Sequence, residues 1–81
     1  MAERIEYACR YTGWGTDPAT GEEAPAVVYE VAGEGDAGLL EAREAITPLR
    51  RWQAAQGLPV DAVVVSRPVH EWAVVDSPAR P

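Results

Sequence analysis

Alternating apolar and polar positions predict two β-strands in the first part of the chain. Residues 4–12 and 26–32 each carry an apolar side chain at every second position, the pattern of a strand with one buried face. Between them, residues 13–24 read GWGTDPATGEEA, and their glycines and proline break regular structure. The two strands are therefore expected to form an antiparallel hairpin with a long loop. The alternating apolar positions are Ile5, Tyr7, Cys9 and Tyr11 in the first strand and Val27, Tyr29 and Val31 in the second.

A helical repeat follows over residues 37–56. Asp36 is the predicted N-cap and Gly57 the predicted C-terminal stop. Pro48 falls inside this span, where its ring clashes with a carbonyl of the preceding turn. The sequence thus predicts either one kinked helix or two short helices that meet at Thr47. The apolar stripe expected to face the core consists of Leu39, Ala42, Ala45, Ile46, Leu49 and Trp52.

The last part of the chain predicts two more strands and a tail. Residues 60–67 are apolar on both faces, which is typical of a central strand or of one whose second face is covered. Pro68 is expected to interrupt this strand, and residues 71–76 are expected to form the last one. Residues 1–76 would then form one compact domain, followed by a flexible tail over residues 77–81.

This order of elements predicts an α+β fold of the type β-β-α-β-β. We expect a two-layer domain in which the helix packs on one face of a mainly antiparallel four-stranded sheet. The other face of the sheet would have no second layer to cover it. Tyr, Trp or Val side chains exposed there would form an apolar patch, and such patches commonly mark interfaces.

The composition favours a binding protein over an enzyme. The 81 residues include no lysine, one histidine and one cysteine, so the usual nucleophiles and bases are scarce. Asparagine and phenylalanine are also absent, as a GC-rich genome would produce. In composition and layout, with the Val-rich segment VVVSRPVHEWAVVD near the end, the chain resembles accessory proteins of high-GC bacteria and their bacteriophages. This resemblance has no defining motif and implies no site residues.

The same features predict the compartment. A single cysteine cannot form an internal disulfide, which fits a reducing environment. No apolar run is long enough to span a bilayer, and no signal peptide is recognisable. We therefore expect a cytoplasmic protein that does not bind membranes.

Negative charge is concentrated in residues 17–44. This segment holds eight carboxylates and one base, Arg43, for a local charge of −7, whereas the whole chain carries −6. Direct nucleic-acid binding is disfavoured because it relies on cationic contacts to phosphate. The segment is either a solvated surface or a patch that mimics nucleic-acid phosphates and inhibits a nucleic-acid-handling enzyme. The second alternative requires one shared face for Glu22, Glu23, Glu34, Asp36, Glu41 and Glu44.

A glycine motif, GEGDAG, occupies residues 33–38 at the predicted junction of strand and helix. Gly33, Gly35 and Gly38 match the spacing of a dinucleotide-binding fingerprint. Glu34 and Asp36 oppose this interpretation because they place two negative charges where a phosphate would bind. A strand-to-helix turn is the favoured interpretation, and nucleotide binding is the alternative.

Cys9 and His70 are the remaining candidates for chemistry. They lie about sixty residues apart in the sequence, which is a weak signal for a zinc site or for a catalytic pair. Cys9 lies among the apolar positions of the first strand, so we expect it to be buried and inert. The sequence therefore predicts no catalytic residue, no metal site and no cofactor.

The leading hypothesis is a small, acidic, non-enzymatic module that binds a protein partner. It would act as a homodimer or as a subunit of a larger assembly, because 81 residues build only a thin core. Tryptophan is enriched at interface hot spots, and carboxylates can steer a basic partner. The predicted partner-binding residues are Trp14, Glu22, Glu23, Glu34, Asp36, Glu41 and Trp72.

Overall fold

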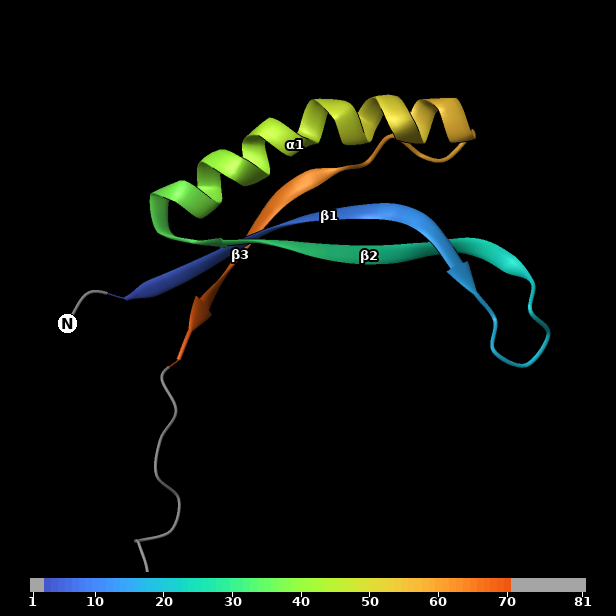
Figure 1. The fold of residues 1–81 in the computed structure, drawn as a ribbon, viewed down its shortest axis with the longest axis horizontal. Helices are drawn as coiled ribbons and strands as arrows, with labels where there is room; N and C mark the ends of the chain where they lie inside the picture. The colour runs from blue at the N-terminus through green and yellow to red at the C-terminus, as the bar shows by residue number, and fades with distance from the viewer. Residues whose placement is uncertain (1–2, 71–81) are drawn as a thin grey trace, which may run out of the picture.

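The computed structural model describes residues 3–70 as three strands and one helix (Figure 1). In chain order these are β1 (Arg4–Thr16), β2 (Glu23–Glu34), α1 (Gly35–Gln56) and β3 (Val63–Val69). The fold class is α+β, as predicted from the sequence. The predicted fourth strand over residues 71–76, with Trp72, and the predicted tail over residues 77–81 lie outside the described residues.

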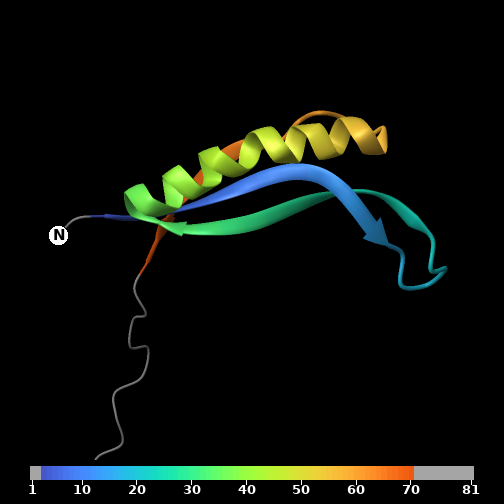
Figure 2. The same cartoon turned by 45° about the horizontal axis from the view of Figure 1, so that its top comes forward.

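The sheet is antiparallel, with strand order β2-β1-β3. Since β2 and β3 both run antiparallel to β1, they run in the same direction, and α1 connects them across the sheet. Ala32 is an extra residue in β2, because Tyr7 pairs with Gly33 while Ala8 pairs with Val31. Such a bulge increases the local bend and twist of a strand. Figures 1 and 2 show the sheet as an arch with α1 over its convex side.

The core lies between α1 and the sheet, and small side chains form its centre. Ala42 of α1 is fully buried, and Cys9 of β1 is 3% exposed. The Cys9 thiol donates a hydrogen bond to the Ala42 carbonyl oxygen at 3.3 Å. Toward the end of the helix, Tyr11 and Trp52 meet edge to face at a centroid distance of 6.3 Å. The predicted stripe of α1 thus faces the sheet, although Trp52 is partly exposed.

The glycine motif forms a tight turn that presses the start of α1 against the end of β2. Gly33 has a φ of +146° and Gly35 a φ of +66°, conformations that L side chains rarely adopt. Gly38 packs so closely that an added Cβ would lie 2.3 Å from the Gly33 carbonyl carbon and oxygen. The predicted N-cap at Asp36 is wrong: Glu34 occupies the N-cap position, and Asp36 lies in the first turn of α1.

Pro48 is accommodated within one continuous helix, so α1 is not split at Thr47. Figure 1 shows that the helix bends along its length and follows the arch of the sheet. Proline removes one backbone hydrogen bond and is a usual cause of such bends. Gly57 ends the helix as predicted, with a left-handed φ of 71° and its N–H bonded to the Ala54 carbonyl oxygen at 3.2 Å.

The strands extend beyond the limits predicted from the sequence. β1 continues through Thr16, where a loop was predicted from residue 13. Gly13 is buried, and an added Cβ there would lie 3.2 Å from the Val28 side chain and 3.3 Å from the Tyr11 ring, so a glycine fits this tightly packed position. β3 begins at Val63 and contains Pro68, which was predicted to interrupt it. Among the described strands β3 lies at an edge, where a proline without an N–H is tolerated. Among residues 3–70 β1 is the central strand, and a central position of β3 in a four-stranded sheet stays a prediction, because residues 71–76 lie outside the described part of the chain.

A polar cluster around the buried side chain of Gln53 holds the α1–β3 connection against β1. Gln53 is fully buried, and its amide nitrogen donates to the Thr12 carbonyl oxygen at 3.0 Å and to Asp61 Oδ1 at 2.7 Å. Its amide oxygen accepts from the backbone nitrogens of Asp61 and Ala62 at 3.1 and 3.2 Å. Asp61 in turn accepts from the Thr12 backbone nitrogen at 2.9 Å and from the Thr12 hydroxyl at 2.5 Å. This cluster fixes where β3 starts along β1.

We expect acid to weaken this cluster through Asp61. Its hydrogen bonds with Thr12, and then that with Gln53, lower the pKa of Asp61 from 3.8 to about 2. The sign follows from linkage, because the unfolded chain binds this proton more readily than the folded one. The contribution of Asp61 to folding is therefore present above about pH 4 and lost as the pH falls toward about 2.

Urea unfolding measured at several pH values between about 2 and 5 tests this expectation. In Asp61→Asn the part of the pH dependence that comes from this carboxylate should disappear. The control, Asp36→Asn, removes an exposed carboxylate of α1 and should retain that part. A pH dependence that Asp61→Asn leaves unchanged would contradict the role assigned to Asp61.

Candidate binding face

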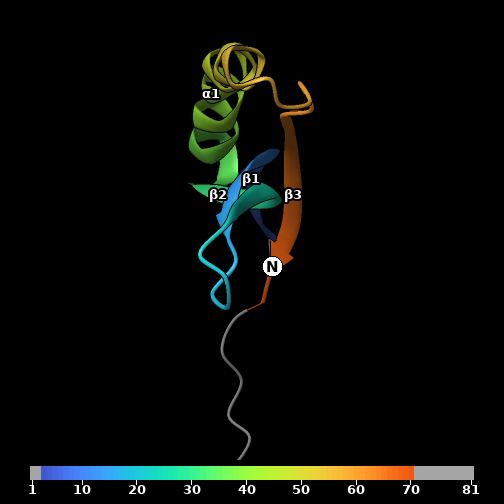
Figure 3. The same ribbon diagram turned by 90° about the vertical axis from the view of Figure 1, so that its right-hand side faces the viewer.

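The side of the sheet opposite α1 is bare in the described part of the chain. Figure 3 views the molecule end-on, with α1 on one side of the three strands and no other described element on the opposite side. We call this side the open face. Strand alternation and register place on it Glu6, Ala8 and Arg10 of β1, Val27, Tyr29 and Val31 of β2, and Val65 and Arg67 of β3.

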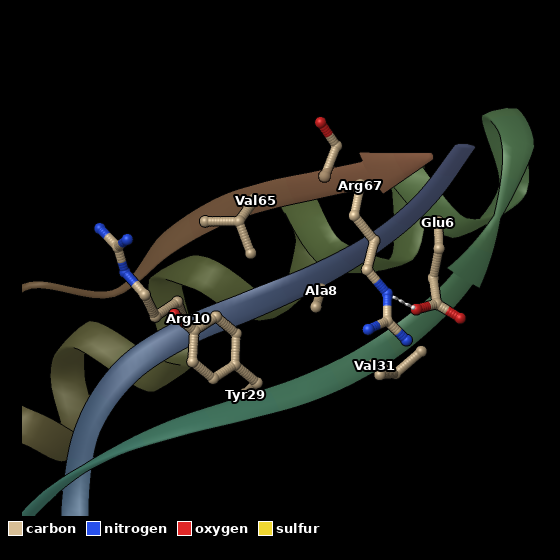
Figure 4. Close-up of a pocket in the computed structure, with 8 residues that line it drawn as sticks. Glu6, Ala8, Arg10, Tyr29, Val31, Val65 and Arg67 are labelled. Atoms are coloured by element: carbon tan, nitrogen blue, oxygen red, sulfur yellow. Dashed lines mark hydrogen bonds and ion pairs between the residues drawn. The ribbon is translucent and has the colours of Figure 1, made fainter. Parts of the chain in front are cut away.

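Apolar side chains cover most of the open face. Val27, Tyr29 and Val31 are 65%, 62% and 56% exposed, and they follow one another along the same face of β2. In the centre Ala8 lies between Val31 and Val65, its cross-strand neighbours (Figure 4). The short Ala8 side chain leaves a hollow of about 520 Å³ above β1. This apolar patch is the one that the sequence predicts for an uncovered sheet face.

Three charged side chains border the hollow. Arg67 Nε and Glu6 Oε1 form an ion pair at 2.7 Å, drawn as a dashed line in Figure 4. Arg10 lies at the other side of Ala8, next to Tyr29, and has no hydrogen-bond or ion-pair partner among residues 3–70. Asp61 lines a neighbouring hollow together with Arg10, Val27 and Tyr29, so two arginines and two carboxylates border the open face.

Trp14 lies away from the centre of this face. It was predicted in a loop, but it belongs to β1, where it pairs with Pro25. Its indole nitrogen donates to Gln56 Oε1 of α1 at 3.1 Å, and the residue remains 42% exposed. Trp14 therefore ties the hairpin to the end of the helix. Its role in partner binding stays a prediction, and Trp72 lies outside the described residues.

The acidic residues named in the sequence analysis do not share one face. Glu22 and Glu23 lie where β2 begins, and Glu34 lies where it ends. A strand of 12 residues spans about 40 Å, so these groups occupy opposite ends of the molecule. Glu34 is also paired with Arg4, through contacts of 2.7 and 3.1 Å. The remaining three, Asp36, Glu41 and Glu44, are exposed on α1.

Cys9 and His70 do not meet either. Cys9 pairs with Val64 within the sheet, whereas His70 follows the end of β3, which pairs with Arg4. Burial, and then the nearby Glu30 carboxylate, raises the pKa of the Cys9 thiol above 9.0 and keeps it protonated. Cys9 is 3% exposed, which confirms the predicted burial. Among residues 3–70, no three His, Cys, Asp or Glu side chains lie close enough together to hold a metal ion.

The comparisons with known proteins give no relative for this chain. It matches no protein family, no curated protein and no solved structure. No helix within residues 3–70 has the length and apolar character needed to cross a membrane. The surface itself is therefore the basis for assigning a function.

Sequence reasoning missed Tyr29 and Arg10 as site residues. The alternation of Val27, Tyr29 and Val31 was visible, but the sequence does not show which face of β2 the helix covers. The two faces of β2 could have been distinguished by the size of their side chains. A helix can approach a strand closely where small residues such as Ala26 and Ala32 face it. Those two residues share the face opposite Tyr29 and are partly buried.

Proposed function

We propose that this protein is a non-enzymatic protein-binding module and that the open face is its binding surface. The observation that carries the proposal is the run of exposed apolar side chains at Val27, Tyr29 and Val31 on an uncovered sheet. Fully burying one such side chain contributes about 1.5–3 kcal/mol, and each is more than half exposed. A partner that covers all three would gain about 3–5 kcal/mol from them.

The chemistry of the face fits a protein partner. Its centre is apolar and its border carries charges, the arrangement found at protein interfaces, where tyrosine and arginine are enriched. We do not propose nucleic-acid mimicry, because the carboxylates that would imitate phosphates lie at opposite ends of β2. Nor do we propose nucleotide binding. Gly33 and Gly38 serve the close approach of α1 to β2, Gly35 supplies a left-handed φ at the turn, and Glu34 and Asp36 lie between these glycines.

Site-specific photo-crosslinking tests this proposal. A benzophenone amino acid in place of Tyr29 should yield protein adducts in cells of the source organism, because the aromatic ring would lie within an interface. The matched control carries the same group at Leu40 of α1, which is 59% exposed and belongs to the helix. We expect adducts at position 29 and few at position 40. If position 29 yields no protein adduct in cells, the open face is not a binding surface.

A further inference from the structure

We propose that the occupant of the open face is a second copy of this chain, packed face to face about a two-fold axis near Ala8. This inference depends on the proposed function, since it names the partner for the same surface. Three features of the described residues support it: the distribution of charge over the molecule, the order of residues along β1, and the area of the face.

The charge distribution favours this face over the tip of the β1–β2 hairpin, where Asp17, Glu22 and Glu23 have no basic residue beside them in the sequence. Asp36, Glu41 and Glu44 lie on α1, on the side away from the open face, and Glu22 and Glu23 lie near the tip of the hairpin. Two copies that meet through their open faces would keep these carboxylates on the outside of the dimer. The helix itself is electrically balanced, because Arg43, Arg50 and Arg51 offset its three carboxylates.

The order of residues along β1 is self-complementary. Glu6 and Arg10 lie on either side of Ala8 at equal separations of two residues, and all three belong to the open face. The proposed two-fold axis lies between the two sheets near Ala8 and runs across β1, so the two copies of β1 point in opposite directions. Arg10 of each copy then faces Glu6 of the other. This arrangement supplies a carboxylate for Arg10, which has no ion-pair partner among residues 3–70. Isologous interfaces require such self-complementarity.

The edge of β2, which no other strand of residues 3–70 pairs with, is a less favourable contact. Glu30 of β2 and Glu41 of α1 border the same hollow at this edge, and both are exposed. Charged side chains of this kind protect edge strands from pairing with another sheet. Two copies joined along β2 would bring these carboxylates close to their symmetry mates, and they would also leave the apolar face uncovered.

The area of the face is at the lower limit for a specific dimer. Three strands about 4.8 Å apart over the length of β3, with the hairpin beyond, present on the order of 500 Å² per copy. The two copies together bury about 1,000 Å², the lower bound for a biological interface. Two facing arches would enclose one shared core, in which Tyr29 of each copy helps to fill the hollow above Ala8. We expect a reversible dimer with a micromolar dissociation constant.

Sedimentation equilibrium of the full chain from about 1 to about 200 µM tests the inference, because this range brackets micromolar affinity. The wild-type protein should convert from monomer to dimer. Tyr29→Arg should weaken the dimer at least about tenfold, since it places a charge in the apolar centre. Leu40→Arg makes a similar change at a similarly exposed residue of α1 and should leave the affinity unchanged.

A second pair of variants tests the two-fold arrangement. Arg10→Glu places a carboxylate against Glu6 of the other copy and should weaken the dimer at least about tenfold, most strongly at low salt. Arg51→Glu changes the net charge equally on the exposed side of α1 and should have little effect. If Tyr29→Arg unfolds the protein, Tyr29→Ser replaces it. The melting temperature of the wild-type protein should also rise with protein concentration.

Each result separates the inference from the proposed function. A wild-type monomer throughout the concentration range would overturn the second copy as occupant. Protein adducts at position 29 would in that case still support a different partner. A dimer that Tyr29→Arg leaves intact but Leu40→Arg disrupts would place the interface on α1. That result would overturn both the second copy as occupant of the open face and the proposed function of this face. Equal weakening by Arg10→Glu and Arg51→Glu would overturn the axis near Ala8.

Discussion

Gly38→Ala is expected to reduce the free energy of unfolding by about 2–3 kcal/mol. The new methyl group would lie 2.3 Å from the carbonyl carbon and oxygen of Gly33, and the obstacle is backbone that cannot rotate aside. The change cannot be explained by helix propensity, because alanine favours a helix over glycine by about 1 kcal/mol. A small domain has only about 5–15 kcal/mol of stability in total, so the expected loss is large.

Urea unfolding measures this loss, and Gly35→Ala is the matched control. Gly35 has a φ of +66° but no atom within 4 Å of an added Cβ, so its substitution costs only the left-handed conformation, about 1–2 kcal/mol. Gly38→Ala should therefore be the more destabilised of the two. A Gly38→Ala variant as stable as the wild-type protein would show that α1 does not press against the end of β2.

Gln53→Leu is expected to reduce the free energy of unfolding by about 3 kcal/mol or more. Leucine fills a similar volume, but it leaves the backbone nitrogens of Asp61 and Ala62 without their hydrogen-bond acceptor. Each buried polar group without a partner costs about 1–3 kcal/mol. The Thr12 carbonyl oxygen also loses its bond from the Gln53 amide.

Gln56→Leu provides the comparison for this substitution. Gln56 lies three residues further along α1, is exposed, and accepts one hydrogen bond from the Trp14 indole. Its replacement should cost less than about 1 kcal/mol, because water can satisfy the groups that it leaves. Equal losses in the two variants, measured by urea unfolding, would mean that the Gln53 cluster does not hold β3 against β1.

The elements that could be predicted from the sequence are those with a local signal. The alternation in β1 and β2, the apolar stripe of α1 and its end at Gly57 each depend on neighbouring residues, and the structure contains each of these elements. In β2, however, the apolar alternating positions lie on the open face and are exposed. The place of β3 in the sheet could not be predicted in this way. Val64 lies on the side of α1, whereas Val63 and Val65 belong to the open face, so the strand is apolar on both faces whatever its position in the sheet.

The limits of the loops depended on contacts that are distant in sequence. Gly13 was expected to end the first strand, yet it continues β1, where it pairs with Ala26 and where an added Cβ would lie 3.2 Å from the Val28 side chain. Gln53 was not singled out in the sequence, since a glutamine among apolar helix positions gives no sign of its partners. Its four hydrogen bonds join Thr12, Asp61 and Ala62, and only the folded chain brings these residues together.

The candidate site could be predicted as a type of surface but not residue by residue. Residues 3–70 contain one helix, which leaves one face of the sheet uncovered in this part of the chain, and the apolar side chains on that face are of the expected kind. The charged candidates were chosen because carboxylates are dense in this part of the sequence. Their density does not show toward which side of the molecule each side chain faces. The structure distributes them over both ends of β2 and along α1, whereas Arg10, on the open face, stands outside the acidic segment.

Hydroxyl-radical footprinting of Tyr29 tests most directly whether another protein molecule covers the open face when a partner is present. The modification rate should be high in dilute purified protein and several-fold lower in concentrated protein or in lysate of the source organism. Leu40, with nearly the same exposed fraction, should react at the same rate in all three samples. A Tyr29 rate that is the same in all three samples would contradict the central claim, because the open face would then remain in water throughout.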